Sequence, residues 1–118
     1  MSIARITAFN NLLRDIVETL CRKFPHDKEL DYTKSQVELS LSISPRTTIV
    51  SFIQSTQPYL EKILHKDEEF FLNLAGETKA LSSLSIGDKW SQLEDGEKEK
   101  LWKNVQKMVV LGNKILAE

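Results

Sequence analysis

The side chains that could perform acid–base or metal chemistry in this chain are few and scattered. His26 and His65 are the only groups that titrate near neutrality without help from their surroundings. His65 stands two residues before Asp67, and such a pair could orient an imidazole or supply two metal ligands. Because a metal site needs three or four converging ligands, we expect a solvated histidine near a helix end, no metal site and no cofactor.

A run of carboxylates, Asp67, Glu68 and Glu69, directly precedes Phe70 and Phe71. Paired carboxylates can act as general acid and base when burial raises the pKa of one of them. The same residue types are favoured in the first turn of a helix, where they complement the helix dipole and stay exposed. We expect this second, structural role.

Nucleophilic catalysis has as little support. Cys21, the single cysteine, falls at the edge of an apolar helix face, where cysteine usually behaves as a small hydrophobic side chain. The sequence contains no dinucleotide-binding, Walker, nucleophile-elbow or Cys-x-x-Cys motif. We therefore predict that the protein is not an enzyme. A lone cysteine has no partner for an intramolecular disulfide, which fits a reducing, intracellular location.

A row of lysines runs along the helix predicted from about residue 96 to residue 117. At 100° per residue, four lysines share an arc of about 60°. They are Lys100, Lys103, Lys107 and Lys114. Such a row could follow the phosphates of a nucleic acid in a salt-dependent manner. A solvated helix face balanced by Glu97 and Glu99 would explain the same pattern.

The same helix is more apolar than packing on one side requires. Taking Lys100 as 0°, the core-facing side is centred at about 120°, whereas Val110 lies at about 280° and Leu111 at about 20°. Either the bundle encloses this helix on all sides, or these side chains form a partner or self-association surface. Trp102, at the edge of the apolar arc, is expected to anchor the core, and it is also included with Val110 and Leu111 as a candidate partner-binding residue.

The composition is that of one compact domain over residues 1–118. Of the 118 residues, 41% are hydrophobic and 28% are charged, and no repeat, linker or low-complexity tract divides them. Sixteen basic and seventeen acidic residues give a net charge of −1, so any attraction to nucleic acid must be local. Polar residues interrupt every apolar stretch before the ~18 residues of a membrane span. We expect neither a membrane span nor a secretory signal.

Hydrophobic periodicity predicts an all-α fold, a compact bundle of about five or six helices with long N- and C-terminal helices. The first helix should run from Ser2 to Phe24, and Ser44 followed by Pro45 starts another. Residues 37–43 alternate like a strand but also fit a helix face. Because an isolated strand cannot pair its backbone, we favour the helix.

The remaining helical segments are shorter. A break is expected at Pro58, Asp67 should cap a segment that ends at Gly76, and short turns with Trp90 as a lid should fill residues 77–94. Asp95 should cap the last helix.

Four short motifs occur in order between residues 44 and 116. They are Ser44-Pro45-Arg46, Pro58-Tyr59, Asp67-Glu68-Glu69-Phe70-Phe71 and Leu101-Trp102-Lys103-Asn104-Val105-Gln106. In this combination the chain resembles small, uncharacterised all-helical proteins encoded by nucleocytoplasmic large DNA viruses. The resemblance implies a helical fold and a viral protein of the host cytoplasm or the virion. It supplies no catalytic residues.

These features together predict a non-enzymatic protein-interaction module, an adaptor or virion-associated protein, that uses the face of its last helix. The partner would be another protein or a second copy of the chain, with no membrane and no small-molecule substrate. The alternative is a nucleic-acid or phosphate-binding protein that uses the lysine row.

Overall fold

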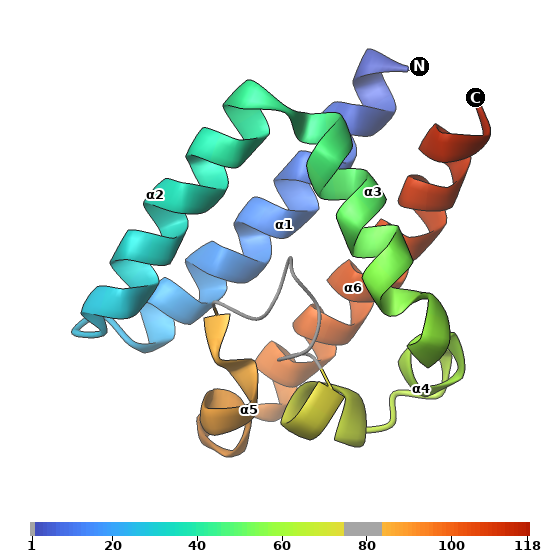
Figure 1. The fold of residues 1–118 in the computed structure, drawn as a ribbon. Helices are drawn as coiled ribbons and strands as arrows, with labels where there is room; N and C mark the ends of the chain where they lie inside the picture. The colour runs from blue at the N-terminus through green and yellow to red at the C-terminus, as the bar shows by residue number, and fades with distance from the viewer. Residues whose placement is uncertain (1, 75–83) are drawn as a thin grey trace.

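The chain is an all-α bundle, as predicted, in a computed structural model that describes residues 2–74 and 84–118 (Figure 1). Its α-helices are α1 (Ile3–Lys23), α2 (Lys28–Ile43), α3 (Pro45–Thr56), α4 (Leu60–Leu64), α5 (Ile86–Lys89) and α6 (Asp95–Ala117). The 3-10 segments η1 (Gln57–Tyr59) and η5 (Trp90–Gln92) and the π-helical segment η2 (Phe70–Leu74) lie between them. No strand occurs among the described residues.

The two long terminal helices form the centre of the bundle. α1 begins where the Ser2 hydroxyl accepts a hydrogen bond from the Arg5 amide, and it ends just before Pro25, as predicted. α1 packs more extensively against α6 than against any other element, and the two termini lie at the same end of the molecule (Figure 1). Ser2 and Arg5 both bind the Glu118 carboxylate, which ties these termini together.

The helical interpretation of residues 37–43 is confirmed, because they form the last two turns of α2. Asp27 starts this helix by accepting hydrogen bonds from the amides of the second and third helical residues. Only Leu41 of the alternating stretch is fully buried, whereas Leu39 and Ile43 remain exposed. The alternation therefore reflects a helix whose apolar side chains extend beyond its core-facing side.

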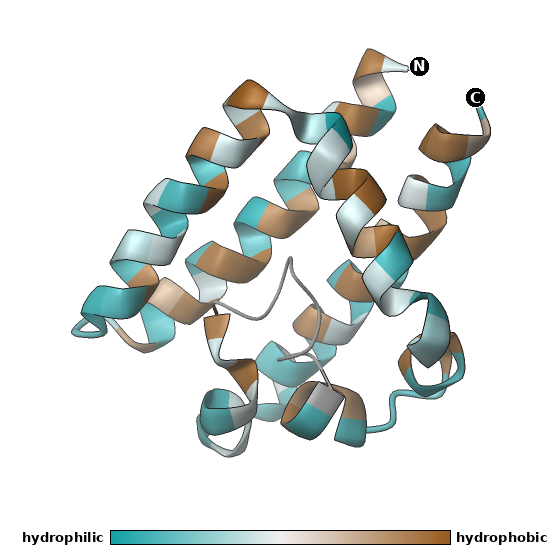
Figure 2. Cartoon of the chain, viewed as in Figure 1, coloured by the Kyte–Doolittle hydropathy of each residue, from teal (hydrophilic) through white to brown (hydrophobic). Residues whose placement is uncertain are grey.

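An aromatic cluster closes the end of the bundle opposite the termini. The ring of Phe71 stacks on Trp90 with centroids 4.6 Å apart and contacts Trp102 at 4.5 Å. Trp90 is 2% exposed and also meets Trp102 edge-on, so it covers this end of the core much as expected for a lid. Figure 2 shows the corresponding alternation of hydrophobic and hydrophilic segments along α1, α2, α3 and α6.

Three details of the shorter segments differ from or extend the expectations. The cap of α6 is Glu94 rather than Asp95, since Glu94 and Glu97 form a reciprocal capping box. The break at Pro58 is a 3-10 turn between α3 and α4. Asp67 caps the following segment by accepting from the Glu69 amide, but that segment becomes π-helical. The predicted end at Gly76 and the turns over 77–83 lie outside the described residues.

Candidate protein-interaction surface

Helix α6 is covered on one side and open on the other. It packs against α1, α3 and α4. Its buried residues are Leu101, Trp102, Asn104, Val105, Met108, Val109, Gly112 and Ile115. Outside this face, Val110 is 52% exposed and Leu111 is partly buried against the edge of the core. The bundle therefore does not enclose α6 on all sides.

Trp102 does not belong to the open side. Its side chain is 4% exposed and lies within the aromatic cluster with Phe71 and Trp90. Its inclusion among the partner-binding residues is therefore corrected: its ring is already packed within its own subunit and has no surface left to offer. The expectation that Trp102 anchors the core is the one that the geometry supports.

The four lysines of the predicted row are not equivalent. The Lys100 ammonium lies 3.1 Å from a carboxylate oxygen of Asp15 on α1. The other Asp15 oxygen accepts a hydrogen bond from Asn104 at 3.0 Å. Burial alone would raise the pKa of Asp15, but the bonds from Asn104 and Lys100 outweigh it and lower that pKa. Lys100 is thus part of the α1–α6 interface and is set apart from the row.

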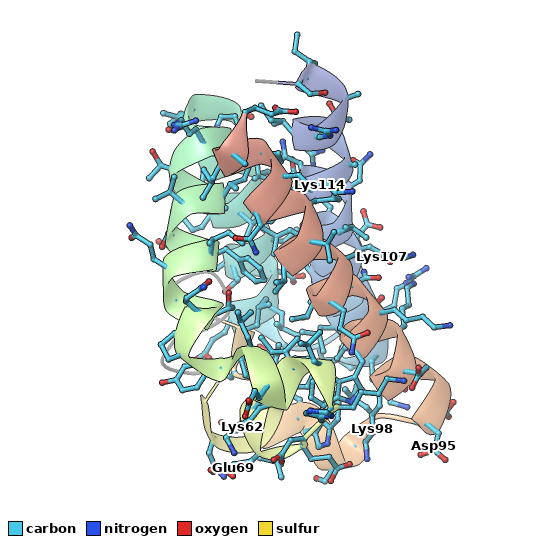
Figure 3. The ribbon with its side chains drawn as sticks, turned by 90° about the vertical axis from the view of Figure 1, so that its right-hand side faces the viewer. Lys62, Glu69, Asp95, Lys98, Lys107 and Lys114 are labelled. Atoms are coloured by element: carbon cyan, nitrogen blue, oxygen red, sulfur yellow. The ribbon has the colours of Figure 1, made fainter. Side chains whose placement is uncertain are left out.

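The remaining three, Lys103, Lys107 and Lys114, are exposed, and within the described part of the chain they form no ion pair. In Figure 3, Lys107 and Lys114 both lie along the α6 ribbon. The acids expected to balance the row are engaged elsewhere. Glu97 binds Lys23 at 3.3 Å and Glu99 binds Lys66 at 2.5 Å. Lys103 contributes only a minor, purely electrostatic lowering of the Glu99 pKa, after the Lys66 hydrogen bond.

These lysines and the exposed aliphatic side chains share one stripe. On the α6 wheel, five residues fall within about 100° of arc. We call them the α6 surface: Lys103, Lys107, Val110, Leu111 and Lys114. One hollow, beside Gln106, is lined by the first four of them. A second hollow lies between α1 and α6, where Lys107 and Leu111 face Ala8 and Leu12. Lys107 and Leu111 therefore form a ridge between two depressions.

The residues considered for catalysis do not converge. His26 and His65 are exposed, and among the described residues no group of three metal-ligating side chains occurs. Glu69 and Asp67 both bind Lys62, at 3.0 and 3.5 Å, and the Glu69 amide bond lowers the pKa of Asp67. The carboxylate run is thus exposed, as expected, but it precedes η2 and does not form its first turn.

Cys21 is partly buried beneath α2, with its sulfur 3.9 Å from the Leu30 carbonyl oxygen. Burial raises the pKa of its thiol. Because the thiolate is the nucleophile, this environment disfavours nucleophilic chemistry and agrees with the reading of Cys21 as a small hydrophobic side chain.

Sequence reasoning missed one feature, an uncharged groove of about 410 Å³ between α2 and α3. Its lining residues are Leu13, Gln36, Val37, Leu39, Ser40, Ile43, Ser44, Thr47, Thr48 and Ser51. The available signal was the excess of aliphatic residues in 37–43, of which Leu39 and Ile43 are 53% and 74% exposed. In the sequence, these aliphatic residues bear on whether 37–43 form a helix or a strand, and do not by themselves indicate a groove.

The fold and the α6 surface define a small helical bundle with one helix face that is both cationic and apolar. Comparison with protein-family models, with curated proteins and with solved structures found no match to the chain. Among the described residues, no helix has the length and apolar character that crossing a bilayer requires. The α6 surface is therefore the feature of this chain that bears most directly on function.

Proposed function

We propose that the chain is a non-enzymatic protein-interaction module that docks a partner protein on the α6 surface. The observation that carries this proposal is the position of Val110, which is 52% exposed within a long helix. The lysines that flank it form no ion pair with any residue that the structure describes. Single exposed aliphatic residues are common on monomers. Here, however, the exposed valine lines one hollow together with Leu111, and Leu111 also lines the hollow between α1 and α6. These hollows give a partner side chain a place to insert.

The motif resemblance adds a setting to this proposal. Small all-helical proteins of large DNA viruses share the order of a proline-started helix, an acidic-Phe turn and a Leu-Trp-Lys helix. On that basis the module would be an adaptor or virion-associated protein that acts on a viral or host protein. This setting supplies no additional site residue.

Nucleic-acid binding is the second candidate. It is favoured by the row of exposed lysines, which form no ion pair within the described part of the chain. Two features weigh against it. Val110 and Leu111 come between Lys107 and Lys114 along the chain and flank these lysines on the helical wheel. A bound phosphate backbone would therefore lose water against aliphatic side chains, which is unfavourable. Three phosphate contacts would also give a salt slope of only about −3, compared with about −10 for a strong DNA-binding protein.

The proposal is tested by selecting helical peptides from a random display library against the folded chain. Each enriched peptide is then measured against Val110→Asp and against Leu39→Asp. Leu39 is the matched control, since it is 53% exposed at a mid-helix position of α2. Far-UV circular dichroism and the unfolding midpoint verify that both variants fold.

We expect enriched peptides to lose at least tenfold in affinity with Val110→Asp and to be unaffected by Leu39→Asp. Peptides that tolerate Val110→Asp would refute docking on the α6 surface. Peptides that instead depend on Leu39 would also refute it and move the binding site to the α2–α3 groove. For the second candidate, a fluorescent 20-nucleotide DNA is titrated at 50 and 200 mM salt. Binding that falls steeply with salt and survives the uncharged change Val110→Ser would favour nucleic acid over protein.

A further inference from the structure

Among the described residues, no acidic side chain forms an ion pair with the three lysines of the α6 surface. Three carboxylates on α6 and on the neighbouring α1 are already bound to other lysines. Asp15 holds Lys100, Glu97 holds Lys23 and Glu99 holds Lys66. Because these neighbouring acids are bound elsewhere, the exposed lysines create a local positive potential. This potential exists although the net charge of the whole chain is −1.

The lysine row and the hollow beside it are elongated, and so suit an elongated binding partner. Lys103 and Lys114 are eleven residues apart, which corresponds to about 16 Å along the helix axis, or three helical turns. The hollow between α1 and α6 runs beside Lys107 and Leu111, and its α1 wall includes Ala8 and Leu12. A third helix placed there would bury an apolar strip against Leu12 and Leu111 while one edge faced the lysines.

The opposite wall of this hollow is not cationic. Arg14 is bound to Glu38 at 2.8 Å, and Asp15 is bound to Lys100, so both are internally compensated. Glu18, which also lines the α1 wall, is exposed and carries a negative charge. The potential across the hollow is therefore asymmetric, positive along α6 and neutral to negative along α1.

We infer that the partner segment is an acidic amphipathic helix of about three turns. It lies over the α6 surface and along the hollow between α1 and α6, with its apolar residues on Leu12, Leu111 and Val110. Its carboxylates are directed at Lys103, Lys107 and Lys114. This inference rests on the proposed function and specifies its partner. Charge complementarity sets the orientation of the helix and raises the association rate, while the aliphatic contacts hold the complex.

The test uses three versions of one helical display library in which the apolar positions are randomised identically. The flanking positions are fixed as Glu, as its uncharged isostere Gln, or as Lys. Each library is selected against the wild-type chain, and clones that lose binding to Val110→Ser, a change that adds no charge, are counted. The best Glu clone and its Glu-to-Gln counterpart are then measured by fluorescence anisotropy at 50 and 300 mM salt.

We expect Val110-dependent clones mainly from the Glu library. The Glu peptide should bind about tenfold more tightly than its Gln counterpart at low salt, a ratio that three surface ion pairs can supply. That ratio should shrink toward one at high salt. It should also shrink in Lys103→Gln/Lys107→Gln but persist in the control Lys28→Gln/Lys34→Gln. The control removes two exposed α2 lysines and so changes the net charge equally.

The remaining outcomes separate this inference from the proposed function. Val110-dependent clones that arise equally from the Gln or Lys libraries would overturn the acidic partner and leave docking on α6 intact. A Glu preference that is unchanged in Lys103→Gln/Lys107→Gln would overturn it as well. The absence of Val110-dependent clones from all three libraries would overturn both.

Discussion

Asn104 on α6 bridges to α1 through two hydrogen bonds from one amide nitrogen, to the Asp15 carboxylate at 3.0 Å and to the Leu12 carbonyl oxygen at 3.2 Å. Asn104 is 6% exposed, so these bonds form at the buried seam between the two longest helices. If one helix slid along the other, these bonds would break and leave buried polar groups without partners, which is costly. The bridge therefore fixes the register of α1 and α6, and with it the hollow beside Leu111.

Replacement of Asn104 should destabilise the bundle by removing this bridge. We expect Asn104→Ala to lower the free energy of unfolding by about 1–3 kcal/mol, because the Leu12 carbonyl and one Asp15 oxygen lose their donor. Urea denaturation measures the change. Asn113→Ala is the control, since Asn113 is exposed on the same helix and bonds only within it, to Val109. An equal loss in both variants would contradict the role assigned to Asn104.

The lowered pKa of Asp15 predicts an acid-dependent part of the stability. Because the folded-state pKa lies below the ordinary value of 3.8, the charged carboxylate stabilises the fold at neutral pH, and this contribution is lost as the pH falls through the folded-state pKa. Asp15→Asn cannot be protonated. Its free energy of unfolding should therefore fall less between pH 6 and pH 2.5 than that of the wild type. Parallel pH profiles for the two proteins would contradict this prediction.

Gly87 allows α5 to approach the π-helical segment η2. A Cβ at this position would lie 2.5 Å from the backbone oxygen of Leu72, which cannot move aside as a side chain could. We expect Gly87→Ala to cost about 1–3 kcal/mol by overpacking. Gly96→Ala, where a Cβ meets nothing within 4 Å, should be neutral or stabilising by up to about 1 kcal/mol. Thermal unfolding of the pair gives the comparison.

The sequence predicts partner contact for both Trp102 and Val110, but substitutions at the two positions should affect the stability of the fold very differently. Trp102→Ala removes a buried ring from the aromatic cluster and should cost about 3–5 kcal/mol. Val110→Ser changes a half-exposed side chain and should stay within about 0.5 kcal/mol of wild type. Denaturant titrations decide the matter, and a large loss for Val110→Ser would show that the α6 surface belongs to the core.

The helices themselves were largely predictable. The start of α1 at Ser2, its end before Pro25 and the start of α3 at Pro45 depend on capping groups and proline geometry within a few residues. The position of α6 follows from its own 3.6-residue periodicity. Helix ends and helix positions of this kind depend on residues close together in the chain. The sequence therefore predicted them to within about one residue.

Only the tertiary structure decided which side chains of α6 are exposed and which of its lysines form ion pairs. The sequence placed Lys100 in one row with Lys103, but Lys100 is bound to Asp15, a residue 85 positions away. It left open whether Val110 is buried, and the answer depends on which sides of α6 are covered by α1, α3 and α4. A helical wheel gives the direction of each side chain but not the neighbours that it meets. The α6 surface therefore became visible only when the other helices were in place.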